Sequence, residues 1–494
     1  MVPHQELADA SIADLRSRLE SGELSVRRLA EMHLERTAAL DQAGPNLRSV
    51  IELNPDWEEI ADQLDEERRH TAVRGPLHGI PILVKDNIDT GDRMLTTAGS
   101  LALTGAPAPA DAPLVGRLRA AGMLLLDKTN LSEWANFRST RSSGGWSGRG
   151  RQCRNPHVLD RTPCGSSSGS AVAVAAGLAP VAVGTETDGS IICPSSANGV
   201  VGIKPAVGLV SSDGIIPISR SQDSAGAHAR HVNDAALLLG ALAGGSADFT
   251  RHLDPAVLRG RRLGVLREPY TGYSEHTDRV HATALAALRD LGADLIEVTI
   301  ATAEAMRADN SRLEKTVLQF EFKSGIDSYL AARPGIGPRS LSDLIRFNEE
   351  HADEEMAYFR QEIFEESQSR PGLDAAEYLS ALAASGRLSR ERGIDATLRR
   401  HRLDALVAPS RPPAWVVDQI NGDRVLGGST QPSAMAGYPI ITVPAGMAFD
   451  ALPLGLAFFA GPGSEALLLG MAFAFEQLVN ARRAPRFLPT LEFP

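Results

Sequence analysis

The chain has 494 residues, of which 43% are hydrophobic and 22% are charged, as in ordinary globular proteins, and this length suffices for a large buried core. Its formal net charge of −11 and the lack of any Lys/Arg-rich run argue against a nucleic-acid partner, because binding to phosphates needs a basic surface. No stretch reaches the roughly 18 consecutive apolar residues of a membrane span, so we expect no membrane partner.

The first 40 residues are predicted to be helical. Ser11 and Ser25 are candidate N-caps, and apolar residues recur at helical spacing after Ser25. The start of the chain, from Met1 to Glu6, lacks the basic segment and apolar run of a signal peptide. We therefore expect a soluble, cytoplasmic protein.

A strand–helix–strand rhythm follows. The apolar run at 80–84 predicts a buried strand that ends at Lys85, 113–122 predicts a helix with a glycine stop, and 123–127 predicts a second buried strand. The stretch 132–170 is rich in Ser, Gly, Arg and Asn and has little periodicity. A loop of this length inside a compact domain is usually functional.

The same rhythm continues through the middle of the chain. An alanine-rich helix is predicted at 170–177, a buried strand at 180–184 that leads into a loop with Ser190, and a further strand at 200–203. Residues 262–299 again predict a strand, a helix and a strand. Such alternation is typical of an α/β fold with a largely parallel sheet.

At about 303–400 the composition shifts to Ala, Glu, Arg and Leu, which predicts a helical insertion or cap. Strands on both sides of this segment indicate that 1–494 forms one discontinuous domain without tandem repeats. The later elements are strands at 405–409, 440–444 and 454–459 and a helix at 464–480.

The three cysteines, Cys153, Cys164 and Cys193, are too few and too widely spaced for a disulfide framework. No pair has the spacing of zinc ligands. We expect all three to be small buried packing residues. Cys164 and Cys193 lie close in sequence to two serines, so we expect them to line the same site without taking part in its chemistry.

Two serines and one lysine stand in glycine-bearing sequence. Ser166 lies in Cys-Gly-Ser-Ser-Ser-Gly-Ser, Ser190 lies 24 residues further on in Thr-Asp-Gly-Ser-Ile, and Lys85 closes Gly-Ile-Pro-Ile-Leu-Val-Lys. A serine hydroxyl is a poor nucleophile unless a neighbour removes its proton. None of the 12 histidines sits in a motif beside either serine. His78 and His228 fit structural roles better than a place in a triad, so the pattern indicates an acyl-transfer enzyme with a lysine base.

Burial at the end of a strand would lower the pKa of Lys85, because a low-dielectric surrounding disfavours the ammonium form. The alternative is a solvated lysine, or one that forms an ion pair with Asp86. A lysine at a strand end is expected to lie too far from the nucleophile to act directly. A bridging serine could carry the proton between them, which gives Ser166 a role, and the glycines beside it allow close approach.

The loop of Thr187, Asp188, Gly189 and Ser190 has a second candidate role. Amide hydrolysis builds negative charge on the substrate oxygen, and each backbone N–H group aimed at that oxygen is worth about 3 kcal/mol in comparable sites. The alternatives are an ordinary Gly-Ser turn for this loop and a flexible linker for the segment around Ser166. The apolar helix that follows Ser166 argues against the linker.

Together these motifs resemble the amidase signature family from about residue 75 to the C-terminus. The matching segments are the Lys85 run, the Gly/Ser-rich segment at 165–170, the Ser190 loop, and late motifs at 436–439, 443–446 and 452–455. The resemblance implies an α/β/α sandwich around a large mixed, mostly parallel sheet. It implies a Ser-cisSer-Lys triad with Ser190 as nucleophile, Ser166 as cis-serine bridge and Lys85 as base, and no metal or cofactor. The backbone amides of Thr187, Asp188, Gly189 and Ser190 would form the oxyanion hole.

The chain departs from the usual family pattern at a few positions. Cys164, Ser168 and Asp188 stand where glycine is usual, and Ile192 stands where many members, amidotransferase subunits included, have arginine. The residues for the core chemistry remain, whereas a transamidation role is disfavoured. Segments at 146–150, 185–194 and 222–226 are similar to the branch of the family that removes the C-terminal amide from peptides and releases ammonia.

Three hypotheses follow. The first is a serine amidohydrolase that favours peptide C-terminal amides over aryl, fatty or cyclic amides. The second is one subunit of an amidotransferase, and the third is a non-catalytic binding protein on the same scaffold. Under the first, the partner is a small-molecule or peptide amide and the protein is a monomer or homodimer. Phe320, Phe322 and Tyr329 are candidate pocket aromatics, with packing of the helical core as the alternative.

Overall fold

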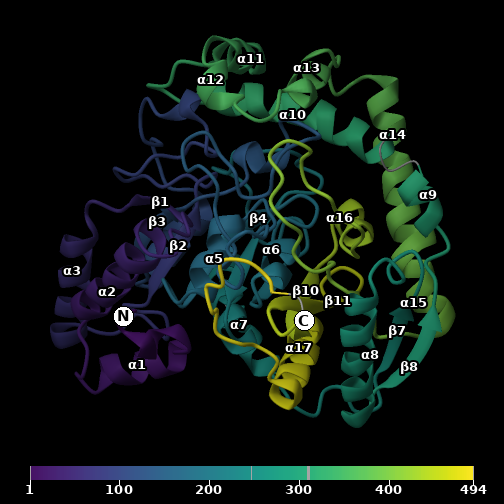
Figure 1. Ribbon diagram of the computed structural model, residues 1–494, viewed down its shortest axis with the longest axis horizontal. Coiled ribbons are helices and arrows are strands. Elements are labelled where there is room, and N and C mark those ends of the chain that lie inside the picture. Colours follow the sequence, from purple (N-terminus) through teal and green to yellow (C-terminus); the bar gives the residue numbers. More distant parts are fainter. Residues whose placement is uncertain (1, 246, 309–311, 493–494) are drawn as a thin grey trace.

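The computed structural model describes residues 2–245, 247–308 and 312–492. Within them, one sheet of 11 strands runs in the order β1-β3-β2-β4-β6-β5-β10-β11-β9-β7-β8, and helices pack around it (Figure 1). The strands are β1 (Val50–Leu53), β2 (Pro81–Lys85), β3 (Leu124–Thr129), β4 (Val181–Glu186), β5 (Val201–Lys204), β6 (Ser224–Ala229), β7 (Arg262–Leu266), β8 (Asp294–Val298), β9 (Ala405–Pro409), β10 (Ile440–Ala448) and β11 (Leu452–Phe459).

The predicted α/β fold around a large mixed sheet is confirmed. Parallel pairs form two blocks, β3–β2–β4 and β9–β7–β8. Antiparallel pairs join these blocks through β6, β5, β10 and β11. Parallel pairing is therefore less extensive than the sequence predicts. The reasons are that β10 and β11 form a hairpin and that β6, whose small residues show no strand pattern, lies between β4 and β5.

The helices follow the predicted order, with additional ones that had no strong sequence signal. Their bounds are α1 (Ile12–Glu20), α2 (Val26–Thr37), α3 (Trp57–His70), α4 (Pro113–Ala120), α5 (Ser168–Ala175), α6 (Ile192–Ala197), α7 (Val232–Ala243), α8 (Glu275–Asp290), α9 (Ala303–Ala308), α10 (Leu313–Ala332), α11 (Leu341–Glu350), α12 (Ala352–Glu355), α13 (Glu362–Gln368), α14 (Ala376–Gly386), α15 (Asp395–His401), α16 (Gln431–Ala436) and α17 (Glu465–Val479).

The two predicted N-caps are confirmed. Ser11 Oγ accepts a hydrogen bond from the Asp14 N–H at 3.1 Å, and Ser25 Oγ accepts one from the Arg28 N–H at 3.0 Å. Each bond satisfies one of the backbone donors left open in the first turn of a helix. Among the described residues, no helix combines the length and the apolar character that crossing a bilayer requires.

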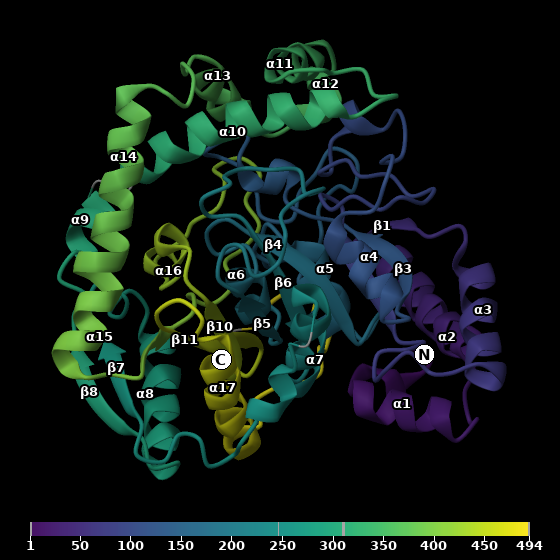
Figure 2. The same ribbon diagram turned by 180° about the vertical axis from the view of Figure 1, so that it is seen from behind.

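Helices α9–α15 occupy the segment that the sequence predicts to be helical, of which residues 309–311 lie outside the described part. Figures 1 and 2 show α10, α11, α12 and α13 across one end of the molecule and α14 running down one side. Phe322 and Phe364 of this segment join Trp134 and Ile218 of the loops beneath it in one buried apolar cluster. The strands on either side of the segment, β8 and β9, belong to the same sheet.

Candidate active site

Lys85 is the last residue of β2, which pairs with β3 and β4, and its side chain is fully buried. Its Nζ donates hydrogen bonds of 2.8 Å to both Ser166 Oγ and Thr185 Oγ1. Burial lowers the pKa of Lys85 to about 7, although the carboxylates of Asp223 and Glu186 act to raise that pKa.

The alternative ion pair between Lys85 and Asp86 does not form. The Asp86 carboxylate instead accepts hydrogen bonds from Thr97 Oγ1 and from the Gly99 N–H, and it lies 3.5 Å from Arg149. Asp86 lies in the turn that follows β2, and its side chain is held away from Lys85 by these partners. Lys85 therefore meets Ser166, while Asp86 is used in a different network.

Ser166 lies on the loop that precedes α5, and the Gly165–Ser166 peptide bond is cis. Neighbouring groups fix this loop on both sides. The Ser132 N–H donates to Ser166 O at 3.0 Å, and the Ser167 N–H donates to Ser190 O at 3.1 Å. The second bond places the loop of Ser166 directly against the loop of Ser190.

The Ser190 loop connects β4 to α6. Gly189 has a φ of +77°, a conformation that favours glycine, and a Cβ there would collide with the guanidinium of Arg411. Two backbone N–H groups after Ser190, those of Ile191 and Ile192, donate to Glu186 Oε2 at 2.7 and 2.9 Å. Glu186, the last residue of β4, thus holds the loop where it enters α6.

The N–H groups of Thr187, Asp188, Gly189 and Ser190 donate to no acceptor within the described residues, and the Ser190 hydroxyl has no partner there either. The Thr187 side chain donates to Asp223 Oδ1 at 2.5 Å, and Asp223 Oδ2 accepts from two further N–H groups. In the sequence Asp223 stands out only as part of the motif at 222–226. The structure shows that it supports the loop from behind.

A pocket of about 220 Å³ opens over Ser190. Ser190 is 8% exposed, whereas Lys85 and Ser166 are fully buried behind it. The pocket is lined by Ala135, Asn136, Phe137, Cys164, Gly165, Thr187, Asp188, Ser190, Cys193, Ile218, Leu318, Arg411, Trp415, Asp423 and Val425. Its aromatic walls are Phe137 and Trp415. Neither was predicted, because both lie in loops without periodicity.

The three aromatics proposed from the sequence do not line this pocket. Phe320 packs against Tyr378, Phe322 packs in the cluster with Trp134, and Tyr329 donates to Asp89 Oδ1 at 2.8 Å. The alternative, that these side chains pack the helical segment, is correct. Leu318 on the same helix is the residue that reaches the pocket.

The two histidines are placed as the sequence predicts. His78 Nε2 lies 3.1 Å from Leu64 O, remote from the serines. His228 Nδ1 lies 2.8 Å from Ser195 Oγ, and burial lowers its pKa to about 3, so the ring is neutral. Neither ring forms a hydrogen bond with Ser166 or Ser190 within the described residues.

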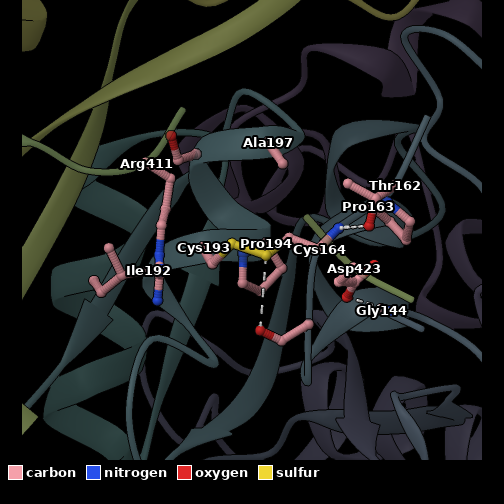
Figure 3. Close-up of a disulfide and its surroundings, with 12 residues drawn as sticks. Gly144, Thr162, Pro163, Cys164, Ile192, Cys193, Pro194, Ala197, Arg411 and Asp423 are labelled. Atoms are coloured by element: carbon pink, nitrogen blue, oxygen red, sulfur yellow. Dashed lines mark hydrogen bonds between the residues drawn. A yellow bond between two sulfur atoms is a disulfide. The ribbon is translucent and has the colours of Figure 1, made fainter. Parts of the chain in front are cut away.

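The expectation for the cysteines is wrong for two of the three. Cys164 and Cys193 form a disulfide with their Cα atoms 5.8 Å apart (Figure 3), and only Cys153 is free and buried. The chain has too few cysteines for a disulfide framework, but an isolated pair needs only proximity. Cys164 lies two residues before Ser166 and Cys193 three residues after Ser190. The prediction that these serines lie together therefore also implied that the two cysteines lie close to each other. As predicted, both cysteines line the pocket.

Within the described residues, no group of His, Cys, Asp and Glu side chains is arranged to hold a metal ion. The site therefore consists of a buried lysine, a buried serine bonded to it, and a second serine at the mouth of a pocket. The backbone N–H groups of residues 187–190, the last of which belongs to that second serine, donate to no acceptor among the described residues.

Comparison with known proteins shows the family to which this chain belongs. The family model described as Amidase matches residues 29–469. The structure is similar to native peptide amidase from Stenotrophomonas maltophilia, with a TM-score of 0.92 and 48% identity over 97% of this chain and 99% of that chain. A probable amidase of Arabidopsis thaliana is 38% identical over 98% of this chain and 92% of its own length. An amidase family protein from Bacillus anthracis has a TM-score of 0.87 and 32% identity over 98% of this chain and 93% of its own.

Proposed function

The chain belongs to the amidase family and is an amidase that hydrolyses C–N bonds, and on this premise we propose that it removes the C-terminal amide from peptides. The reaction runs through an acyl-enzyme on Ser190 and releases ammonia. One observation carries the proposal above the others: the 2.8 Å hydrogen bond between the buried Nζ of Lys85 and Ser166 Oγ, directly behind the pocket serine.

In the first half of the reaction, Ser190 Oγ attacks the amide carbon. Ser166 takes the Ser190 proton and passes its own hydroxyl proton to neutral Lys85. The negative charge that develops on the substrate oxygen is stabilised by the backbone N–H groups of residues 187–190, which have no acceptor among the described residues. We therefore propose that Thr187, Asp188, Gly189 and Ser190 form the oxyanion hole.

Collapse of the tetrahedral intermediate breaks the C–N bond. The proton held on Lys85 returns through Ser166 to the leaving nitrogen, which departs as ammonia. A water molecule then repeats the sequence on the ester of Ser190 and yields the carboxylic acid and the free enzyme. The steps use Lys85 twice as a proton carrier and need neither metal nor cofactor.

The preference for peptide amides is supported by the similarity to a peptide amidase and by the pocket itself. Phe137 and Trp415 offer apolar surface for a side chain, while Asp188 and Arg411 offer an acceptor and donors for peptide N–H and C=O groups. A site limited to a bare aliphatic amide would not need polar groups of both kinds.

The test is ammonia release from a C-terminally amidated dipeptide by wild type and by Ser190→Ala, with the exposed Ser342→Ala as matched control. We expect Ser190→Ala to lose at least about 10³-fold in kcat and the control to equal wild type. Full activity of Ser190→Ala would show that Ser190 is not the nucleophile. If the wild type hydrolysed only aryl, fatty or cyclic amides, the proposed substrate class would be wrong but the proposed catalytic mechanism would stand. Activity of the isolated chain would argue against an obligate amidotransferase partner.

A further inference from the structure

The Cys164–Cys193 disulfide joins the loop that carries Ser166 to α6, the helix that directly follows the Ser190 loop. Two hydrogen bonds connect the same parts of the chain: Asn198 Nδ2 donates to Pro163 O at 2.9 Å, and the Ser167 N–H donates to Ser190 O at 3.1 Å. The Cys164–Cys193 bond lies between them along the chain. Figure 3 shows the bond running from Cys193 on α6 to Cys164 beside Thr162 and Pro163. The disulfide is the covalent member of this set.

Cys164 is held in an unusual backbone conformation. Its φ is +57°, in the left-handed region that residues with a Cβ seldom adopt. The Cys164 N–H donates to Thr162 Oγ1 at 3.0 Å, and Ser168 Oγ donates to Cys164 O at 2.7 Å. These bonds and the disulfide together keep Cys164 in this conformation, one residue before the Gly165–Ser166 peptide.

The disulfide also borders the substrate pocket, although both cysteines are largely buried. Cys164 and Cys193 both line the pocket above Ser190, with exposed fractions of 7% and 3%, whereas Cys153 is fully buried. Thiol–disulfide exchange requires that a thiolate reach one of the two sulfurs. A small dithiol that enters the substrate pocket meets this bond.

We propose that the Cys164–Cys193 disulfide positions the Ser166 loop against Ser190, and that its reduction by a dithiol suppresses turnover reversibly. The inference rests on the proposed function, because it assigns these cysteines as positioning residues for the same serines. Without the disulfide, Cys164 can leave the left-handed region, and the Ser166 hydroxyl then moves out of line between Ser190 and Lys85.

The exchange is balanced. A thiolate of the dithiol attacks one sulfur, forms a mixed disulfide and releases the other cysteine as a thiolate. The second thiol of the reagent then displaces the first cysteine. Two electrons and two protons pass from the dithiol to the cysteine pair, which becomes two thiols, while the dithiol becomes a cyclic disulfide. An added disulfide reagent reverses the sequence.

The experiment compares oxidised wild type with the same protein treated with dithiothreitol under native conditions. Thiols counted after unfolding should rise from one, Cys153, to all three cysteines. We expect kcat for a dipeptide amide to fall by about 10- to 100-fold, as for a displaced catalytic group, with KM changing much less. Phosphonylation of Ser190 by a fluorophosphonate should slow in parallel, and reoxidation should restore both rates.

Variants separate positioning from general stability. Cys164→Ala/Cys193→Ala should be slow and unresponsive to dithiothreitol, whereas Cys153→Ser should respond as wild type does. Cys164→Gly/Cys193→Ala should regain part of the lost kcat, because glycine accepts the left-handed conformation. Melting temperatures identify any variant that fails to fold. For such a variant, the effect of reduction on wild-type turnover alone tests the proposal.

A reduced protein with three titratable thiols and unchanged kcat would overturn the inference. A failure of the proposed function looks different. In that case oxidised wild type would show neither ammonia release from the dipeptide amide nor labelling of Ser190, before any reduction.

Discussion

Lys85 is fully buried, yet its partners within hydrogen-bond distance are neutral oxygens of Ser166 and Thr185 rather than a carboxylate. Burial therefore lowers its pKa to about 7. A lysine with this pKa is populated in both charge states near neutral pH, which suits a group that accepts and returns a proton. The nearby ring of His228, with its pKa lowered to about 3, stays neutral across the same range.

The pH dependence of turnover should report Lys85. We expect kcat/KM for a dipeptide amide to rise with pH through a limb near pH 7 and to level off above it, because Lys85 must lose its proton before it can act as a base. The measurement is a pH–rate profile from about pH 5 to about pH 9. A profile that is flat across neutral pH would contradict this role for Lys85.

The position of that limb should depend on Asp223. Its carboxylate raises the pKa of Lys85, so Asp223→Asn should move the limb to lower pH. The exposed Asp254→Asn is the matched control and should leave the limb in place. If the limb moved to higher pH, or moved equally in both variants, the limb would report a group other than Lys85.

At the scale of elements, the turn from β4 into α6 depends on one carboxylate. Glu186, the last residue of β4, accepts hydrogen bonds from the N–H groups of Ile191 and Ile192, and the buried cation of Lys204 counters its charge. Negative charge at the start of a helix is also favourable for the helix dipole. The strand end therefore fixes the helix start, and Ser190 lies between them.

Removing this carboxylate should loosen the turn. Glu186→Ala leaves two buried N–H groups without an acceptor, at a cost of roughly 1–3 kcal/mol each, and should lower both kcat and the melting temperature. Glu186→Gln keeps an acceptor oxygen and should lose less of each. Kinetics and thermal unfolding of the pair check this, and equal losses would show that charge alone matters.

Most elements could be located from the sequence because their patterns are strong. Apolar runs predict β2, β4 and β7 to within a few residues, and cap residues predict the starts of α1 and α2. Strand β6 was missed, since Ser-Ala-Gly-Ala-His-Ala carries no strand signal and becomes a strand only between two neighbours. The disulfide was missed for a related reason, because pairing depends on three-dimensional proximity.

In the site, glycine-bearing motifs and family resemblance brought Lys85, Ser166 and Ser190 together. Nothing comparable pointed to Arg411, Trp415 or Asp423. These side chains stand in a loop after β9, and their place in the pocket depends on tertiary packing that neither periodicity nor spacing encodes.

At the scale of the whole molecule, the helical segment is fastened to the loops around the pocket. Glu321 on α10 accepts hydrogen bonds from Ser219 Oγ at 2.5 Å, from the Ser221 N–H at 3.0 Å and from Tyr378 Oη at 2.7 Å. The tethered loop carries Ile218, which lines the pocket. Through it, the helices influence the shape of the substrate site.

Breaking this connection should affect substrate binding more than chemistry. We expect Glu321→Ala to raise KM about ten-fold, equivalent to about 1.4 kcal/mol, the size of one hydrogen bond to a charged group, with a smaller change in kcat. Hydrogen exchange of residues 217–223 should speed up in the same variant. Glu377→Ala, on the exposed side of α14, is the control, and a fall in kcat alone would contradict the expectation.

The order of the strands has a consequence for how such a protein changes over generations. In the described part of the chain, strands β1–β6 are neighbours in the sheet, strands β7–β11 are neighbours, and the two groups meet where β5 pairs with β10. Lys85, Ser166 and Ser190 all belong to the first group, while the second supplies Arg411 and Trp415. Related proteins that descend from one ancestral gene can therefore change which amides they prefer through mutations late in the chain, while they keep the proposed catalytic residues unchanged.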